Sequence, residues 1–387
     1  MKDNGALEVG IFSPGNLRIG AGVENLIYNL VINKPENVNI TIIQTEYLPY
    51  ERLDPSRLKE ISEKAKLITI KLLLPDQIGA IRNIPAPLSF FFHQFYIRLY
   101  FNLVNFRKNR KLFSNFDTVY LTNNWFYSIF RGKKLVGTQH TDFDYLPSKS
   151  GQRQSIKIKL IGAGILFGRI SAFHLFPASR KISSLIKNGN NLILSSGADI
   201  SNYNIGIRSG KPKFLFVGRL EECKGLKFIL DLWLKYNIDC ELNIVGIGPL
   251  YPLKDAYHDY QNIVFKGTLT EKELLEIYSR SDILLSPTMC DTYSMTIAEA
   301  LASGCQVLVS DFLDGVWDVF RDAGYLHYLP LEHSMWARKI EFISANVEEI
   351  RRVAPMVRQL AGRTNDIKEI AHGLYAFLEK ISAQDSK

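Results

Sequence analysis

Two carboxylates, Asp291 and Glu299, flank the place where a loop turns into a predicted helix, in the stretch CDTYSMTIAEALASG. A helix that serves only for packing needs neither of them. Ser294 lies between them and is a residue type that caps helices, because its hydroxyl accepts hydrogen bonds from the first turn. The N–H groups of Ser294, Met295 and Thr296 would then form a positively polarised helix start, which suits phosphates and sugar hydroxyls. A solvated loop acid and a surface glutamate are the plainer alternative.

Two cations, Arg219 and Lys224, lie in the short segment GRLEECKG. Arginine supplies planar paired donors and lysine a mobile point charge, so the two together could hold a diphosphate. Taken alone, the segment is more simply explained by two ordinary surface cations.

The elements that position these residues follow from the apolar runs. Short apolar runs alternate with segments of helical length, which is typical of a parallel α/β sheet. We predict strands within residues 8–13, 39–45, 67–73, 117–122, 134–140 and 172–178, and again within 214–218, 241–246, 263–267, 282–287 and 306–310. The pattern indicates two doubly wound domains, joined in the polar segment SSGADISNYNIGIRSGKPK. Ligands of such sheets bind beyond the carboxyl ends of the strands, so the loops that follow the strands should carry the chemistry.

The ordered set FVGRLEECKG, IVGIGPL, IVFKGTL and SDILLSPTMCDTYSMTIAEALASGCQVLVSD, over residues 214–311, resembles the retaining glycosyltransferases of family 4. The resemblance implies a GT-B fold, in which two Rossmann-like domains face each other with the active site in the cleft between them. It implies an acceptor-binding domain over residues 1–204, a nucleotide-sugar-binding domain over 205–365, and a final helix near 366–387 that packs back on the first domain. It also implies that no metal and no cofactor is bound, and the nucleotide-diphosphate sugar is a co-substrate.

The resemblance also assigns roles to the charged residues. Asp291 and Glu299 become the two acidic positions of the family's Glu-x7-Glu motif, with aspartate in place of the usual first glutamate. Glu299 would bind the ribose hydroxyls and Asp291 would lie by the transferred sugar. Arg219 and Lys224 would neutralise the leaving diphosphate, and the backbone near Leu269 would contact the base. The aspartate is one methylene shorter than the family's glutamate, so the sugar would either sit deeper or make a weaker contact with Asp291.

In the N-terminal half, residues 15–25 (GNLRIGAGVEN) resemble the family's Gly-Gly-x-Glu loop, with Ala21 at the first glycine. Gly22 would let the backbone approach the donor phosphates closely. A plain turn before a helix explains these glycines about equally well.

His140 directly follows a predicted strand, where several family members carry a functional histidine near the transferred sugar. We therefore take His140 and Asp291 as the candidate catalytic residues, with a structural histidine as the alternative for His140. Asp142 and Asp144 match the metal-binding Asp-x-Asp of the other large glycosyltransferase fold, but the surrounding strand pattern does not fit that fold.

The net charge of +8 is unevenly distributed. Residues 1–200 hold 26 Lys and Arg against 14 Asp and Glu, a net +12, whereas residues 201–387 hold 21 against 25, a net −4. The first half should therefore meet an anionic partner, such as a membrane surface, a phosphorylated substrate or nucleic acid. No recognised nucleic-acid-binding module accompanies the charge, so nucleic acid is the least favoured of the three.

The segment LSFFFHQFYIRLYFNLVNFRKNRKLF combines aromatic and basic residues. It would suit a helix in a membrane interface, and a core-packing helix with a solvated basic end is an equal alternative. A second basic region lies within residues 149–169, and a lipid-linked phosphate acceptor would account for both. No apolar run is long enough to cross a membrane, the N-terminus lacks a leader pattern, and the four cysteines have no paired spacing. We expect a cytoplasmic protein, peripheral on the inner face of the membrane.

These observations predict a retaining glycosyltransferase that moves a sugar from a nucleotide-diphosphate donor to a glycan or lipid-linked acceptor. Two alternatives stay open. The departures at Asp291 and Ala21 would also fit a non-catalytic binding protein on a degenerate GT-B fold, and the same fold carries nucleotide-sugar epimerases.

Overall fold

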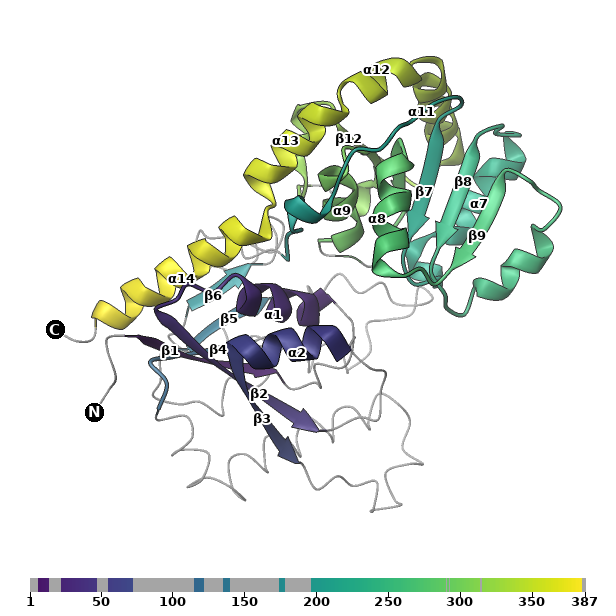
Figure 1. The fold of residues 1–387 in the computed structure, drawn as a ribbon. Helices are drawn as coiled ribbons and strands as arrows, with labels where there is room; N and C mark the ends of the chain where they lie inside the picture. The colour runs from purple at the N-terminus through teal and green to yellow at the C-terminus, as the bar shows by residue number, and fades with distance from the viewer. Residues whose placement is uncertain are drawn as a thin grey trace, which may run out of the picture. The chain divides into compact units, whose positions relative to one another are not determined.

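The structure is a computed structural model of the 387-residue chain. It describes residues 6–13, 22–46, 55–71, 115–121, 135–139, 174–177, 196–289, 291, 293–313 and 315–384. The chain divides into two units, of which the first comprises Met1–Ser196 with Lys368–Lys387 and the second Gly197–Ile367 (Figure 1).

The first unit contains a parallel sheet with the strand order β3-β2-β1-β4-β5-β6. Its strands are β1 (Leu7–Ser13), β2 (Val38–Glu46), β3 (Ala65–Lys71), β4 (Thr118–Leu121), β5 (Leu135–Gln139) and β6 (His174–Pro177). The described helices of this unit are α1 (Gly22–Ile32), α2 (Pro55–Lys64) and most of α14 (Ile367–Gln384). The strand order is that of a doubly wound Rossmann sheet.

The second unit repeats this order in a parallel sheet, β12-β11-β10-β7-β8-β9. Its strands are β7 (Lys213–Val217), β8 (Glu241–Val245), β9 (Ile263–Gly267), β10 (Ile283–Ser286), β11 (Gln306–Ser310) and β12 (Leu326–Leu329). Its helices are α7 (Leu226–Lys235), α8 (Glu271–Arg280), α9 (Met295–Ala302), α10 (Asp318–Asp322), α11 (His333–Ala345), α12 (Val347–Arg352) and α13 (Ala354–Thr364). Four short 3-10 turns accompany them: η5 (Ile200–Asn202), η6 (Glu222–Lys224), η7 (Tyr251–Ala256) and η8 (Asp311–Leu313). The predicted α/β fold with two doubly wound domains is confirmed.

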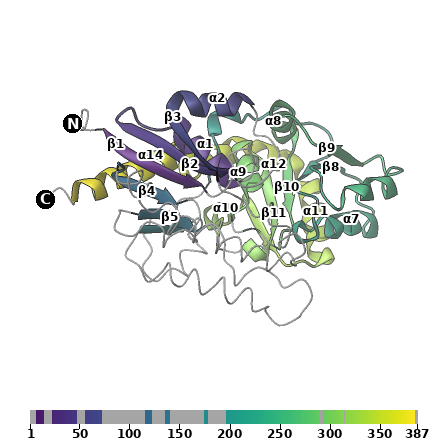
Figure 2. The same cartoon turned by 90° about the horizontal axis from the view of Figure 1, so that it is seen from below.

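An unbroken apolar run in strand β7 explains why the sheet of the second unit is covered on both faces. Phe214 and Phe216 of β7 pack into a core that includes residues of α7 and α11, which lie side by side (Figure 2). Leu215, between them, packs into a separate core with residues of α9 and α13. Successive side chains of a strand point to opposite faces, so an unbroken apolar run produces a strand buried on both sides.

Residues 197–204, which the sequence analysis assigns to the first domain, lie in the second unit. Ala198 forms a parallel bridge with Asp366, and Ile200 is buried in the core of the second unit. Arg358 donates hydrogen bonds to the carbonyls of Ile200 and Tyr203. The segment consists of turn-forming residues without periodicity, and its partners Asp366 and Arg358 lie far along the chain. Its own sequence therefore does not show to which unit it belongs.

The end of the chain, Lys368–Lys387, lies in the first unit. The hydroxyl of Tyr375 in α14 donates to the carbonyl of Leu30 in α1, with 2.8 Å between the oxygens. The side-chain amide of Asn37 donates to Glu379 over 2.7 Å. The second unit is therefore an insertion within the sequence of the first.

Strand β12 (LHYL) was not among the predicted strands. It lies at an edge of the sheet beside β11, and its last three residues are only half-buried. A half-buried edge strand does not need a continuous Val- and Ile-rich run, so its sequence carries little signal.

We expect the free energy of unfolding of the second unit to fall by about 1–2 kcal/mol as the pH drops from about 6.5 to about 4. Burial, and then the positive charge of Lys339, lower the pKa of His327 in β12 to about 4. Between these pH values the unfolded chain binds a proton that the folded chain does not, so acid favours unfolding; the contribution is complete above pH 6.5. Urea titrations of wild-type protein and His327→Gln at about pH 7 and about pH 4.5 measure this effect.

The substitution should reduce the loss of stability between the two pH values. His258→Gln, at a histidine whose side chain is 71% exposed, is the control and should leave the difference unchanged. An equal pH dependence in wild-type protein and His327→Gln would contradict the assignment.

Candidate functional site

The candidate site lies at the carboxyl edge of the second sheet, where β7 and β10 are neighbours. From β7 the sheet continues to β8 and β9, and from β10 it continues in the other direction to β11 and β12. The loops that follow β7 and β10 therefore start side by side and diverge. This is the topological switch point of a doubly wound sheet, where a crevice for ligands forms.

Glycines let the loops at this edge approach each other through their backbones. A Cβ atom added to Gly225 would lie 2.3 Å from the carbonyl oxygen of Pro287, in the loop after β10. One added to Gly246, after β8, would lie 1.9 Å from the carbonyl oxygen of Gly218. Both glycines also have positive φ, +78° and +128°, which other residues rarely adopt. The loop after β7 is thus held between its two neighbours by contacts that tolerate no side chain.

Lys224 and Asp291 form an ion pair across the switch point. Lys224 ends the 3-10 turn η6 in the loop after β7, and Asp291 lies in the loop after β10. Their side chains are only 20% and 18% exposed. Beside the pair, the N–H of Met289 donates to the carbonyl of Cys223 over 2.7 Å. Two residues that the sequence analysis assigned to phosphate and to sugar are therefore each other's partners here.

Arg219 stands at the start of the same loop and is much more accessible. Its side chain is 74% exposed, and its guanidinium donates to the carboxylate of Glu221 with 2.9 Å between the atoms. An exposed pair of this kind is weak, so the guanidinium can exchange Glu221 for an anionic ligand at little cost.

The start of α9 differs from the prediction in one respect. Ser294 occupies the N-cap position with φ of +67°, and its hydroxyl bonds to the hydroxyl of Thr296 at 3.0 Å. Among the described residues its side chain makes no capping bond to a backbone N–H, because this backbone conformation turns the hydroxyl elsewhere. The predicted N-cap position of Ser294 and the start of the helix at Met295 and Thr296 are therefore confirmed, whereas the side-chain capping bond expected of a serine is not formed. The hydroxyl of Ser294 therefore accepts no capping hydrogen bond from the N–H groups of the first turn of α9.

Glu299 lies near the middle of α9, and its carboxylate is held by a residue that the sequence did not predict. The hydroxyl of Tyr278 in α8 donates to Oε2 of Glu299, with 2.8 Å between the oxygens. Tyr278 is fully buried, and this burial raises the pKa of its hydroxyl well above 10, so it remains a donor. Nothing in the sequence marks this tyrosine, because its position fits an ordinary apolar helix face.

The loop after β9 carries Leu269 and the start of α8. Leu269 is partly buried against the core that contains α9. Thr270 and Glu273 form a capping box at the start of α8: Thr270 accepts a bond from the N–H of Glu273 at 3.3 Å, and the carboxylate of Glu273 accepts one from the N–H of Thr270 at 2.8 Å.

In the first unit, Gly22 is the first residue of α1. The other candidate site residues and basic segments of that unit fall outside the described residues: His140, Asp142, Asp144, the aromatic and basic segment at residues 88–113, and the basic region at 149–169. Within the described ranges, no group of three or more His, Cys, Asp or Glu is arranged to hold a metal ion. In the same part of the chain, no helix combines the length and apolar character needed to cross a membrane.

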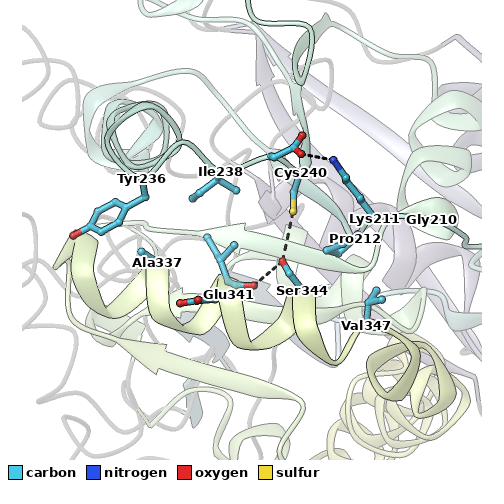
Figure 3. A pocket seen from close by; sticks show the side chains of 12 residues that line it. Gly210, Lys211, Pro212, Tyr236, Ile238, Cys240, Ala337, Glu341, Ser344 and Val347 are labelled. Atoms are coloured by element: carbon cyan, nitrogen blue, oxygen red, sulfur yellow. Dashed lines mark hydrogen bonds and ion pairs between the residues drawn. The ribbon is translucent and has the colours of Figure 1, made fainter.

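A separate pocket of about 680 Å³ lies at the opposite, amino edge of the second sheet (Figure 3). It is formed by residues just before β7 and β8 and by α11, and its lining includes Lys211, Asp239, Cys240, Glu341 and Ser344. Cys240 contacts the hydroxyl of Ser344 at 3.5 Å, and burial raises the pKa of its thiol. No predicted site residue lines this pocket, so it is distinct from the candidate site.

Residues 199–359 match the family model for glycosyl transferases group 1. This range contains the loops after β7 and β10 and the whole of α8 and α9. The GDP-mannose-dependent alpha-mannosyltransferase of Corynebacterium glutamicum is 32% identical over 143 residues, which make up 34% of this chain and 34% of that protein. The matched stretch thus spans about a third of the relative's length.

Solved structures resemble the chain over nearly its whole length, and two of them serve as examples. Sucrose-phosphate synthase from Thermosynechococcus elongatus has a TM-score of 0.74 at 15% identity, covering 98% of this chain and 100% of its own. The Anabaena protein HepE, solved in complex with UDP, has a TM-score of 0.66 at 12% identity, covering 97% and 100%. The likeness shows the shared fold and confirms the predicted GT-B fold class.

Proposed function

We propose that this chain is a glycosyltransferase that moves a sugar from a nucleotide-diphosphate donor to an acceptor hydroxyl. The single observation that best supports this function is the convergence at the switch point of the second sheet. There the Lys224–Asp291 pair and exposed Arg219 lie on loops that flank the start of α9, the helix that carries Glu299. The match of residues 199–359 to glycosyl transferases group 1 covers this same region.

In this proposal the two cations receive the diphosphate. Arg219 offers paired N–H donors from an exposed position, and Lys224 adds a second charge that is largely shielded from water. Negative charge grows on the diphosphate as its bond to the sugar breaks, so fixed cations stabilise the transition state more than the bound donor.

The remaining groups recognise the rest of the donor. Glu299 accepts hydrogen bonds from the ribose hydroxyls, and the backbone near Leu269 contacts the base. The first N–H groups of α9, at Met295 and Thr296, point toward phosphate or sugar oxygens. Asp291 lies by the transferred sugar, and its ion pair with Lys224 keeps its carboxylate oriented.

We propose that the sugar is transferred with retention of its anomeric configuration. The departing diphosphate oxygen takes the proton of the acceptor hydroxyl on the same face, while the new C–O bond forms and the old one breaks. Such a step needs no strong base from the protein. Proton NMR of the first product would test this, and an inverted anomer would overturn retention without overturning transfer.

The acceptor is assigned to the first half of the chain, with its net charge of +12 over residues 1–200. We propose that the acceptor is a glycan or a lipid-linked molecule that bears phosphate, and that in the same half Gly22 lies near the donor phosphates and His140 near the transferred sugar. We also propose that the protein binds peripherally to the cytoplasmic face of the membrane. Co-sedimentation with vesicles tests the last point: binding to phosphatidylglycerol vesicles and not to phosphatidylcholine vesicles is expected. Equal binding to both would count against it.

A thermal-shift screen against UDP, GDP, ADP and their common sugar conjugates tests the function directly. One nucleotide at about a hundred times its dissociation constant should add roughly 2.7 kcal/mol of stability. Arg219→Ala should lose most of this shift, yet keep its own stability because the side chain is 74% exposed. No shift with any nucleotide would overturn the proposal. Binding without sugar transfer to any acceptor would instead support a non-catalytic binding protein.

A further inference from the structure

We propose that Tyr278 is a positioning residue for nucleotide binding, which fixes the carboxylate of Glu299 in the orientation that receives the ribose hydroxyls. The inference rests on the proposed function, in which Glu299 binds ribose. Its starting observation is the 2.8 Å hydrogen bond from the Tyr278 hydroxyl to Oε2 of Glu299.

The chemistry of the two side chains suits this division of roles. A glutamate has three rotatable bonds and, if unsupported, must be ordered when the ligand binds. A tyrosine has a rigid ring, and Tyr278 has 0% exposure, so its hydroxyl is held at a fixed point. A donor held in this way keeps the carboxylate oriented before ribose arrives.

The surroundings of Tyr278 fix its ring. Its backbone carbonyl accepts a bond from the thiol of buried Cys305 at 3.3 Å. The ring of Tyr203 meets it edge-on, with 6.4 Å between the centroids. Arg358 in turn donates to the carbonyl of Tyr203 at 2.9 Å. The donor to Glu299 is thus supported by three separate segments of the second unit.

The helices that carry the pair are also tied together at their ends. Arg208 donates to the carbonyl of Ser279 in α8 at 3.0 Å and to the carbonyl of Ser303, just after α9, at 2.6 Å. The C-terminal carbonyls of helices need donors, and a cation there also complements the helix dipole. One guanidinium therefore sets α8 against α9, and with them Tyr278 against Glu299.

The test compares ribonucleotides with nucleotides that lack the ribose hydroxyls. Isothermal titration measures the binding of UDP, GDP and ADP, and of their 2′,3′-dideoxy forms, to wild-type protein and to Tyr278→Phe. The substitution should weaken binding of the preferred ribonucleotide about tenfold, because a hydrogen bond to a charged group is lost. Binding of its dideoxy form should change less than about twofold, because that ligand has no hydroxyl for Glu299 to bind.

Tyr375→Phe is the matched control. Tyr375 is equally buried, at 2% exposure, and its hydroxyl donates over the same 2.8 Å, but to the backbone carbonyl of Leu30 in the first unit. Each substitution removes one buried hydroxyl, and only Tyr278→Phe should alter nucleotide affinity. In a Glu299→Gln background, Tyr278→Phe should add no further loss, since the two residues act through one contact.

The outcomes separate the inference from the function on which it rests. Failure of wild-type protein to bind any nucleotide would overturn both. Nucleotide binding by wild-type protein that Tyr278→Phe leaves unchanged would overturn the inference alone. A loss of equal size for the ribonucleotide and its dideoxy form would also overturn it, because Tyr278 would then have only a structural role.

Discussion

Lys224→Met is expected to lower kcat/KM for sugar transfer by about a thousandfold. The substitution removes a cation from the proposed diphosphate site. It also leaves the carboxylate of Asp291, which is only 18% exposed, without its partner in the Lys224–Asp291 pair and beside a ligand of the same charge. Both the loss of the lysine charge and the uncompensated carboxylate make the site less favourable for a negatively charged diphosphate. Steady-state kinetics with the donor that the thermal-shift screen identifies would measure the effect.

Two further variants separate these causes. Lys224→Met combined with Asp291→Asn should bind the nucleoside diphosphate about tenfold more tightly than Lys224→Met alone, because the uncompensated carboxylate is neutralised. Lys227→Met removes a lysine three residues away, which is 52% exposed and pairs with exposed Glu222, and should change the rate less than about twofold. Activity of Lys224→Met within about fivefold of wild type would exclude Lys224 from the diphosphate site.

Arg351→Leu is expected to destabilise the second unit by about 3–5 kcal/mol. Arg351 in α12 donates twice to the carboxylate of Asp282, at 3.0 and 3.1 Å, and Asp282 has 0% exposure. Asp282 directly precedes β10 and also accepts a bond from the N–H of Lys213 at the start of β7. Without Arg351, a buried carboxylate would lose its compensating charge.

Urea unfolding followed by tryptophan fluorescence measures this loss, since Trp233, Trp317 and Trp336, three of the chain's four tryptophans, lie in the second unit. Arg352→Leu is the neighbouring control: that side chain is 74% exposed and pairs with half-exposed Glu349, so a change below about 1 kcal/mol is expected. Arg351→Leu combined with Asp282→Leu should be less destabilising than Arg351→Leu alone. A loss for Arg351→Leu no larger than that of the control would refute the buried-pair argument.

The sequence predicts the regular part of this fold well, for a physical reason. Strands of a parallel sheet are buried on both faces, so β7, β8, β10 and β11 appear as short apolar runs. The capping box at Thr270 and Glu273 is equally visible, because both of its bonds are local. The segment at 197–204 could not be placed, because its partners Asp366 and Arg358 lie far along the chain.

The candidate site shows the same limit. Residue types and order identified Lys224 and Asp291, but their ion pair spans 67 positions and exists only because β7 and β10 are neighbours. The donor to Glu299 was missed because Tyr278 looks like a core residue, and it is one. The N-cap position of Ser294 was predicted correctly from its residue type, but the missing side-chain capping bond was not foreseen, because it depends on a backbone with φ of +67°.

The second unit enters and leaves the first at adjacent points. The N–H of Ala198 donates to the carbonyl of Asn365 at 2.9 Å, and the N–H of Ile367 donates to the carbonyl of Ala198 at 3.1 Å. Residues 197–367 therefore form a cassette, that is, an inserted unit whose two ends are hydrogen-bonded to each other. A chimaera that exchanges this cassette with that of a relative would leave the first sheet and its C-terminal helix continuous with their own flanks. Under the proposed function, in which the second unit binds the donor and the first binds the acceptor, such a chimaera would inherit donor choice from one parent and acceptor choice from the other.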